Sequence, residues 1–70
     1  MNTYTTFEEA EDLLSDLAYS KAKEECLLYD SKDVVYVYPC IIDEIYYEFV
    51  SWFSFKDYTI QDFHFKLNKI

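Results

Sequence analysis

The stretch from Ile45 to Phe55, which reads IYYEFVSWFSF, decides between two folds. Read with a period of two residues, it gives one apolar strand face that only Ser51 interrupts, made of Ile45, Tyr47, Phe49, Phe53 and Phe55. Read with a period of about 3.6 residues, it gives an equally continuous helical stripe, made of Ile42, Ile45, Tyr46, Phe49, Trp52 and Phe53. Aromatic and β-branched residues favour strands, and we therefore predict a strand.

The segments that flank this stretch extend the prediction to an antiparallel sheet. Residues 34–38 (VVYVY) have strand composition, and the following Pro39 predicts a strand end, a bulge or an edge position. Residues 63–67 (FHFKL) alternate between apolar and polar side chains. Asp43-Glu44 and Lys56-Asp57 are the predicted turns. The chain contains no glycine, so we expect type I turns or longer loops, because the tightest hairpin turns need positive φ.

The first half of the chain predicts one long helix. Thr6 to Glu9 has the form of a capping box, in which Thr6 and Glu9 satisfy each other's free backbone N–H groups. Apolar residues then recur at spacings of three and four up to the polar turn at residues 30–33, and we predict that the helix ends near Tyr29. This stripe consists of Ala10, Leu13, Leu14, Leu17, Ala18, Ala22, Cys26 and Tyr29.

The predicted fold class is therefore α+β, with a long N-terminal helix packed on a three-stranded antiparallel sheet. The alternative is an α-β-α-β order in which residues 42–53 are helical. At 70 residues we expect a single small acidic domain, residues 1–70, and the 51% hydrophobic content with 8 Tyr, 6 Phe and 1 Trp supplies its core.

The charge balance excludes several classes of protein. Fourteen Asp and Glu face six Lys and no Arg, for a net charge of −8, so we expect no direct binding to nucleic acid. No apolar run approaches the roughly 20 residues of a membrane-spanning helix. Residues 1–10 lack the basic and apolar regions of a signal peptide, which predicts a cytoplasmic protein with reduced, buried Cys26 and Cys40.

The sequence offers few residues for catalysis. His64 is the one histidine, and it has no sequence neighbour that would form a nucleophile–base pair. Together with Cys26 and Cys40 it lacks the close spacing of zinc ligands, and no glycine-rich loop is present to hold a phosphate. We therefore predict that the protein is not an enzyme and uses no cofactor or metal, and that His64 faces solvent from a strand.

Acidic residues are concentrated on the predicted helix. Glu8, Asp12 and Asp16 are spaced four residues apart, and Glu9, Glu11, Glu24 and Glu25 widen the band. One interpretation is that the charge keeps a very aromatic domain in solution. The other is that carboxylates about 6 Å apart imitate successive phosphates and occupy a basic groove. In character, though not by any motif, such a protein resembles phage-encoded inhibitors and DNA mimics.

The function hypothesis is therefore a small acidic inhibitor, encoded by a phage or mobile element, that blocks a host protein with a basic, nucleic-acid-binding surface in the host cytoplasm. The alternative is an immunity or antitoxin-like protein that neutralises a basic toxin. The predicted binding residues on the helix are Glu8, Glu9, Glu11, Asp12 and Asp16.

Aromatic residues on the predicted sheet suggest a second surface. One face of three strands cannot bury the whole set of Tyr36, Tyr38, Tyr46, Tyr47 and Trp52, although tyrosines also tolerate half-exposure in strands. We predict that Tyr36, Tyr47 and Trp52 contribute to an interface, either in a homodimer or with another protein. A structural or assembly subunit that acts through this face is the third hypothesis.

Overall fold

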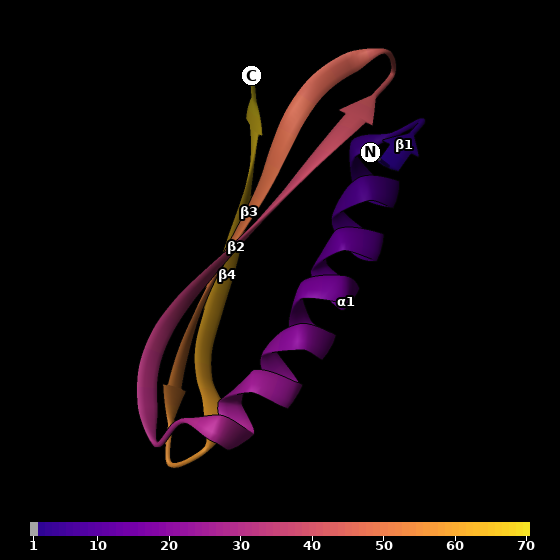
Figure 1. The fold of residues 1–70 in the computed structure, drawn as a ribbon. Helices are drawn as coiled ribbons and strands as arrows, with labels where there is room; N and C mark the ends of the chain where they lie inside the picture. The colour runs from indigo at the N-terminus through magenta and orange to yellow at the C-terminus, as the bar shows by residue number, and fades with distance from the viewer. Residues whose placement is uncertain (1) are drawn as a thin grey trace.

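The computed structural model describes residues 2–70 and consists of one helical layer on a four-stranded sheet (Figure 1). The elements are β1 (Asn2–Tyr4), α1 (Phe7–Glu25), the 3₁₀ turn η1 (Cys26–Leu28), β2 (Ser31–Ile42), β3 (Ile45–Lys56) and β4 (Thr59–Lys69). The strands lie in the order β1-β2-β3-β4. The predicted α+β class is confirmed. The helical alternative for residues 42–53 is wrong, because this segment is strand on both sides of the turn at Asp43-Glu44.

The fourth strand, β1, was not predicted from the sequence. It pairs in parallel with the last three residues of β2, so that Asn2 lies beside Cys40 and Tyr4 beside Ile42. Tyr4 is buried, and its carbonyl oxygen accepts a hydrogen bond from the Asp43 N–H (3.1 Å). Three residues are too few to show a period, which is why the sequence did not predict this strand. With β1 included, the sheet is mixed and has four strands instead of the predicted three.

The start of α1 shows one half of the predicted capping box, the Thr6 side, while Glu9 contacts the Thr5 side chain instead of the Thr6 N–H. Thr6 has extended backbone angles, and its Oγ1 accepts a hydrogen bond from the Glu9 N–H (3.1 Å). The Glu9 carboxylate in turn accepts from Thr5 Oγ1 (3.4 Å). At the other end, α1 stops at Glu25 and the chain tightens into η1, so the predicted helix end near Tyr29 is about one turn too late.

The helix packs on the sheet through a single row of small side chains. Its buried residues, Ala10, Leu14, Ala18 and Ala22, follow one another at intervals of four. Leu13 and Leu17, predicted to join this row, are exposed. Each of them lies one residue before a buried position, and one residue corresponds to a rotation of about 100° around the helix. This rotation turns both leucine side chains out of the contact between helix and sheet. Alanine at three of the four positions brings the helix backbone close to the sheet.

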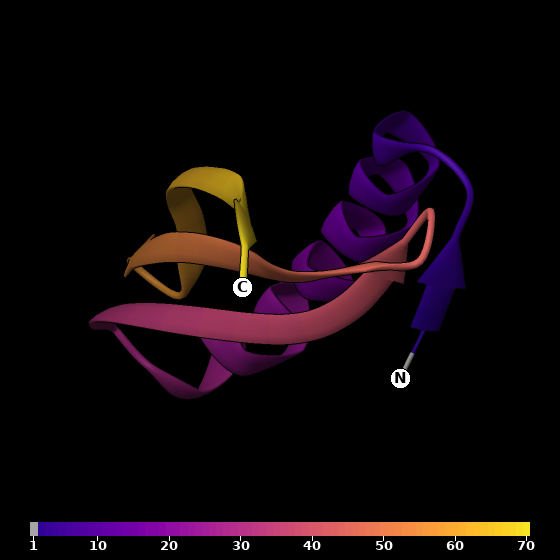
Figure 2. The same ribbon diagram turned by 90° about the horizontal axis from the view of Figure 1, so that it is seen from above.

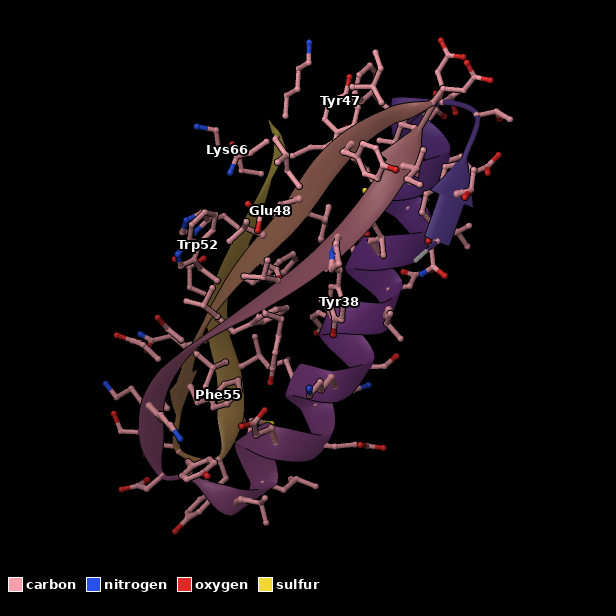
Figure 3. All side chains as sticks on the ribbon, turned by 45° about the horizontal axis from the view of Figure 1, so that its top comes forward. Tyr38, Tyr47, Glu48, Trp52, Phe55 and Lys66 are labelled. Atoms are coloured by element: carbon pink, nitrogen blue, oxygen red, sulfur yellow. The ribbon has the colours of Figure 1, made fainter. Side chains whose placement is uncertain are left out.

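The predicted alternation of β3 is confirmed. Phe49, Phe53 and Phe55 are buried against the helix, and Ser51 between them donates its hydroxyl hydrogen to the Tyr36 carbonyl oxygen (3.3 Å). In Figure 3, Tyr38 and Phe55 point towards α1. The core forms two adjoining clusters, one around Phe49 and one around Phe53 and Phe55, and Tyr38 packs against both.

Both hairpin turns differ from the predicted type. The turn between β2 and β3 has two residues, Asp43 and Glu44, since Ile42 pairs directly with Ile45. The turn between β3 and β4 also has two residues, Asp57 and Tyr58, since Lys56 pairs with Thr59. All four turn residues have positive φ: 48° at Asp43, 68° at Glu44, 54° at Asp57 and 62° at Tyr58. This is the pattern of type I′ turns, whose twist matches that of long strands (Figure 2). Pairing along the two long hairpins outweighs the local cost of positive φ without glycine.

Pro39 occupies an edge, which is one of the three positions predicted for it. It lies within β2 opposite Glu48, and β2 has a neighbour on its other side only at residues 40–42. A proline is tolerated there because its missing N–H removes no bond from the ladder when that position points towards the open edge.

Candidate protein-binding surfaces

The side of α1 opposite the sheet carries a row of carboxylates. Residues two positions away from the buried row are rotated by about 200° around the helix, so they point away from the sheet. Every fourth residue in this series except Ser20 is acidic, and all of them are exposed: Glu8, Asp12, Asp16 and Glu24. We call these four residues the acidic ridge. Glu8, Asp12 and Asp16 follow one another at a rise of about 6 Å, whereas the step from Asp16 across Ser20 to Glu24 is about 12 Å.

The sequence therefore predicted three of the four ridge residues correctly as one row. Glu24 was grouped with Glu25 as a widening of the band, although its spacing of four from Ser20 continues the same row. Glu9 and Glu11 lie on the two flanks of the helix instead of on the ridge, and Glu11 is half-buried. Glu9 is also engaged with Thr5 at the helix start.

Lysines near the helix are held over tyrosine rings and leave the ridge uniformly acidic. Lys21 Nζ lies 5.1 Å from the centre of the Tyr36 ring, and Lys23 Nζ lies 5.9 Å from that of Tyr19. Both lysines occupy flanks of α1, where cation–π attraction offers them a partner. The positive charges of the helix are thus directed sideways while the ridge points into solvent.

Tyr36 is not on the exposed face of the sheet, contrary to the prediction. It is 8% exposed, points towards α1, and donates its hydroxyl hydrogen to the Glu25 carboxylate. Burial, assisted by this carboxylate, raises the pKa of the Tyr36 phenol far above its ordinary value. Tyr36 therefore joins the helix to the sheet and is unavailable to a partner.

Tyr47 also lies on the helix side of the sheet. Its ring contacts Phe7 edge-on, with ring centres 5.2 Å apart, and it is half-buried. Tyr36 and Tyr47 therefore lie on the helix side of the sheet, and of the three predicted interface aromatics only Trp52 faces the other way. The reason is that odd-numbered and even-numbered residues of β3 face opposite sides, and β2 presents its even-numbered residues to the helix.

Trp52 faces away from the helix, as Figure 3 shows together with Glu48 and Lys66. It stacks on His64 across β3 and β4, with ring centres 4.7 Å apart and an angle of 16° between the planes. The predicted solvent-facing position of His64 is confirmed. We call this side of the sheet the open face; its residues include Val35, Val37, Ile41, Tyr46, Glu48, Val50, Trp52, Asp62, His64 and Lys66.

The open face is aliphatic over β2 and polar over β4. Val35 pairs with Trp52 and Val37 pairs with Val50, and both valines are exposed. Tyr46 is the second aromatic residue on this face and is also exposed. Two aromatic residues, instead of the five considered from the sequence, thus remain available on the open face.

Both cysteines are buried and unpaired by disulfide, as predicted. Cys40 lies in the core, where burial raises the pKa of its thiol, and Cys26 donates to the Lys23 carbonyl oxygen (3.3 Å). A shallow hollow of about 400 Å³ lies beside Cys26, between the end of α1 and the start of β4. Across residues 2–70, no three His, Cys, Asp or Glu side chains come together as a metal site.

The chain matches no protein-family model, no curated protein and no solved structure. The helix of residues 7–25, the one α-helix in the described part of the chain, is not long and apolar enough to cross a membrane. Function is therefore inferred from the surfaces themselves.

Proposed function

We propose that this protein is a cytoplasmic binding protein whose acidic ridge docks on the basic surface of another protein and blocks it. The observation that carries the proposal is the row of Glu8, Asp12, Asp16 and Glu24, exposed along one side of a helix whose other side is fixed to the sheet. The function is binding and not catalysis.

Geometry supports this proposal because the ridge is held on a rigid element. The buried row of Ala10, Leu14, Ala18 and Ala22 determines which side of α1 faces solvent, so the backbone positions of the four acidic residues are fixed without a partner. A preorganised row of this kind loses little conformational entropy on binding. It also steers a positively charged partner during diffusion and so raises the association rate at low salt.

The target that fits is a groove that binds a nucleic-acid backbone. Such grooves contain lysines and arginines that contact successive phosphates, and carboxylates spaced about 6 Å apart present charge at a similar interval. The proposed role is that of a DNA mimic, an inhibitor encoded by a phage or mobile element. An immunity protein that neutralises a basic nuclease would use the same ridge in the same way.

A triple substitution tests the ridge. Glu8→Gln, Asp12→Asn and Asp16→Asn remove three exposed charges with little change in shape. The control removes three exposed acids from the turns, through Asp43→Asn, Glu44→Gln and Asp57→Asn, and so reaches the same net charge. Both variants are immobilised beside the wild type, exposed to a bacterial lysate at low salt, and eluted with rising salt.

We expect the wild type and the control to retain nucleic-acid-binding proteins that elute as salt increases, and the ridge variant to lose them. Each retained protein is then tested for displacement from double-stranded DNA by the wild type. If the ridge variant and the turn variant lose binding equally, net charge and not the ridge is responsible. If the ridge variant binds and displaces DNA like the wild type, the proposal is wrong.

One further observation favours a second candidate, an assembly function through the open face. Val35, Val37 and Tyr46 are all exposed on the side of the sheet that no helix covers. Val37→Lys would place a charge at the centre of this side without touching the core. Loss of a captured partner by Val37→Lys, with binding unchanged in the ridge variant, would favour the open face over the acidic ridge.

A further inference from the structure

Strand β4 forms a free edge of the sheet along its whole length. Within residues 2–70 it is the last strand in the order β1-β2-β3-β4 and pairs only with β3 (Figure 2). Its one irregularity lies near its start, where Gln61 is the extra residue between the pairs Phe55–Ile60 and Ser54–Asp62. From Asp62 to Lys69 the edge is regular.

The hydrogen bond at the chain end shows which residues of β4 direct their backbone groups away from β3. The Ile70 N–H donates to the Tyr46 carbonyl oxygen (3.1 Å), so even-numbered residues of β4 direct their backbone groups towards β3. Because this direction alternates along an antiparallel strand, the N–H and C=O groups of the odd-numbered residues point outwards. These residues are Phe63, Phe65, Leu67 and Lys69. Of their outward N–H groups, that of Phe63 already donates to Asp62 Oδ1 (2.8 Å), and pairing with another strand would have to replace this bond.

The same outward-bonding residues carry uncovered aromatic rings. Phe63 is 48% exposed and Phe65 is 40% exposed, although each stacks on its inner neighbour in β3. The Phe63 ring centre lies 5.8 Å from that of Phe53, and the Phe65 ring centre lies 5.3 Å from that of Phe49. Tyr19 reaches Phe63 from the helix, with ring centres 5.5 Å apart, and the outer side of both rings remains open.

The opposite edge of the sheet is protected at one end only, because residues 31–38 of β2 have no strand on their outer side within residues 2–70. β1 covers β2 at residues 40–42, and Pro39 beside it offers no N–H. Proteins blunt sheet edges in these ways because an unpaired edge promotes association with another strand. The β4 edge has no covering strand and no proline from residue 62 to residue 69, and its bulge at Gln61 and the Asp62 side chain blunt only its first part.

The charged residues of β4 would lie opposite residues of the other sign if two copies of this strand paired antiparallel in one particular register. β4 is the one strand of the four with a net positive charge, from Lys66 and Lys69 against Asp62. When His64 lies opposite His64 of a second copy, each Asp62 faces a Lys66 and each Phe63 faces a Phe65. Moving one copy by four residues sets Lys66 against Lys66 or Asp62 against Asp62. The complementary register also keeps the outward-bonding residues opposite one another.

We propose that the partner of this edge is a second copy of the same chain, joined by antiparallel pairing of the two β4 strands around His64. The interface is isologous, as two-fold symmetry requires. Pairing creates one continuous sheet with both helices on the same side, and it covers the four exposed Phe63 and Phe65 rings, on the order of 350 Å² of aromatic surface. Both acidic ridges stay in solvent on the helical side, so a net charge of −8 on each chain does not oppose contact directly.

Charge reversal tests the register by sedimentation velocity across the micromolar range. Asp62 and Lys66 are both exposed, so substitution leaves the core intact. Lys66→Asp and Asp62→Lys each set like charges opposite one another twice, and we expect each to weaken dimerisation by roughly tenfold. Mixing the two single variants restores both opposite-charge pairs, and we expect a heterodimer. Lys56→Asp changes net charge as Lys66→Asp does but lies outside β4, and should leave the dimer unchanged.

A cysteine at the symmetry axis tests the pairing directly. In the proposed register residue 64 faces itself as a non-hydrogen-bonded pair, with Cα atoms about 4.5 Å apart, which a disulfide can bridge. We expect His64→Cys to form a covalent dimer under mild oxidation. Lys66→Cys, on the same face two residues away, faces residue 62 of the second copy and should not.

Three results would overturn the proposal. The first is a wild-type chain that remains monomeric across the micromolar range. The second is a dimer that withstands Lys66→Asp but dissociates on Val37→Lys, which would place the contact on the open face. The third is equal cross-linking of His64→Cys and Lys66→Cys, which would indicate random collision instead of a fixed register.

Discussion

Replacing Glu44 by glycine is expected to stabilise the folded protein. Glu44 has φ of 68° as the second residue of the turn between β2 and β3. A residue with a Cβ atom adopts this region at a cost of about 1–2 kcal/mol, whereas glycine adopts it freely. Glycine also loses about 0.5–1 kcal/mol more in conformational entropy on folding. The difference predicts a gain of about 0.5–1 kcal/mol in the free energy of unfolding.

Urea denaturation measures this gain. For a domain of this size the dependence of unfolding free energy on urea is about 1 kcal/mol per molar, so the midpoint should rise by roughly 0.5–1 M with an unchanged slope. Glu44→Ala is the matched control, because it removes the same exposed charge but keeps Cβ. We expect Glu44→Ala to stay close to the wild type.

Equal midpoints for Glu44→Gly and Glu44→Ala would refute the argument, since the effect could then not come from backbone conformation. A second control reverses the expected sign. Lys56 lies at the end of β3 and outside the set of residues with positive φ. Lys56→Gly should therefore lower the free energy of unfolding by about 0.5–1 kcal/mol.

Three further predictions follow from the core and its polar contacts. Phe49→Ala should cost about 3–5 kcal/mol of unfolding free energy in thermal or urea denaturation, because Phe49 is fully buried, whereas Val37→Ala on the open face should cost far less. The pKa of Tyr36 is raised above its ordinary value of 10.0 in the folded chain, so the unfolded chain loses this proton first as pH rises, and the free energy of unfolding falls above about pH 10. Between about pH 9 and 11, Tyr36→Phe should therefore lose less unfolding free energy than the wild type. Equal losses in urea denaturation of the two proteins would contradict this. Cys26 and Cys40 should react with a thiol reagent only as fast as the chain unfolds, and rapid labelling of the native protein would show that either thiol is accessible.

The helix start and the strand faces were determined locally, and the sequence alone predicted them. Thr6 and Glu9 are three residues apart, so the cap depends on no distant contact. The alternation from Ile45 to Phe55 correctly identified a strand and its buried side, because side chains of a strand point to opposite faces in turn. The ridge residues Glu8, Asp12 and Asp16 followed in the same way from helical spacing.

Tertiary structure decided what the local pattern left open. Leu13 and Leu17 are as apolar as Leu14, and only the narrow contact between helix and sheet selected the row that is buried. Tyr36 and Trp52 are both aromatic strand residues, yet cross-strand register and the position of the helix placed one in the core and the other on the open face.

Turn geometry was also a tertiary outcome. Glu44 and Tyr58 are poor residues for positive φ, and local preference alone pointed to type I turns or longer loops. The long paired strands of both hairpins have a right-handed twist that a type I′ turn continues, and pairing along many residues outweighs a cost confined to two. β1 shows the same principle. Its three residues have no pattern of their own, and they form a strand because β2 and the buried Tyr4 side chain hold them there.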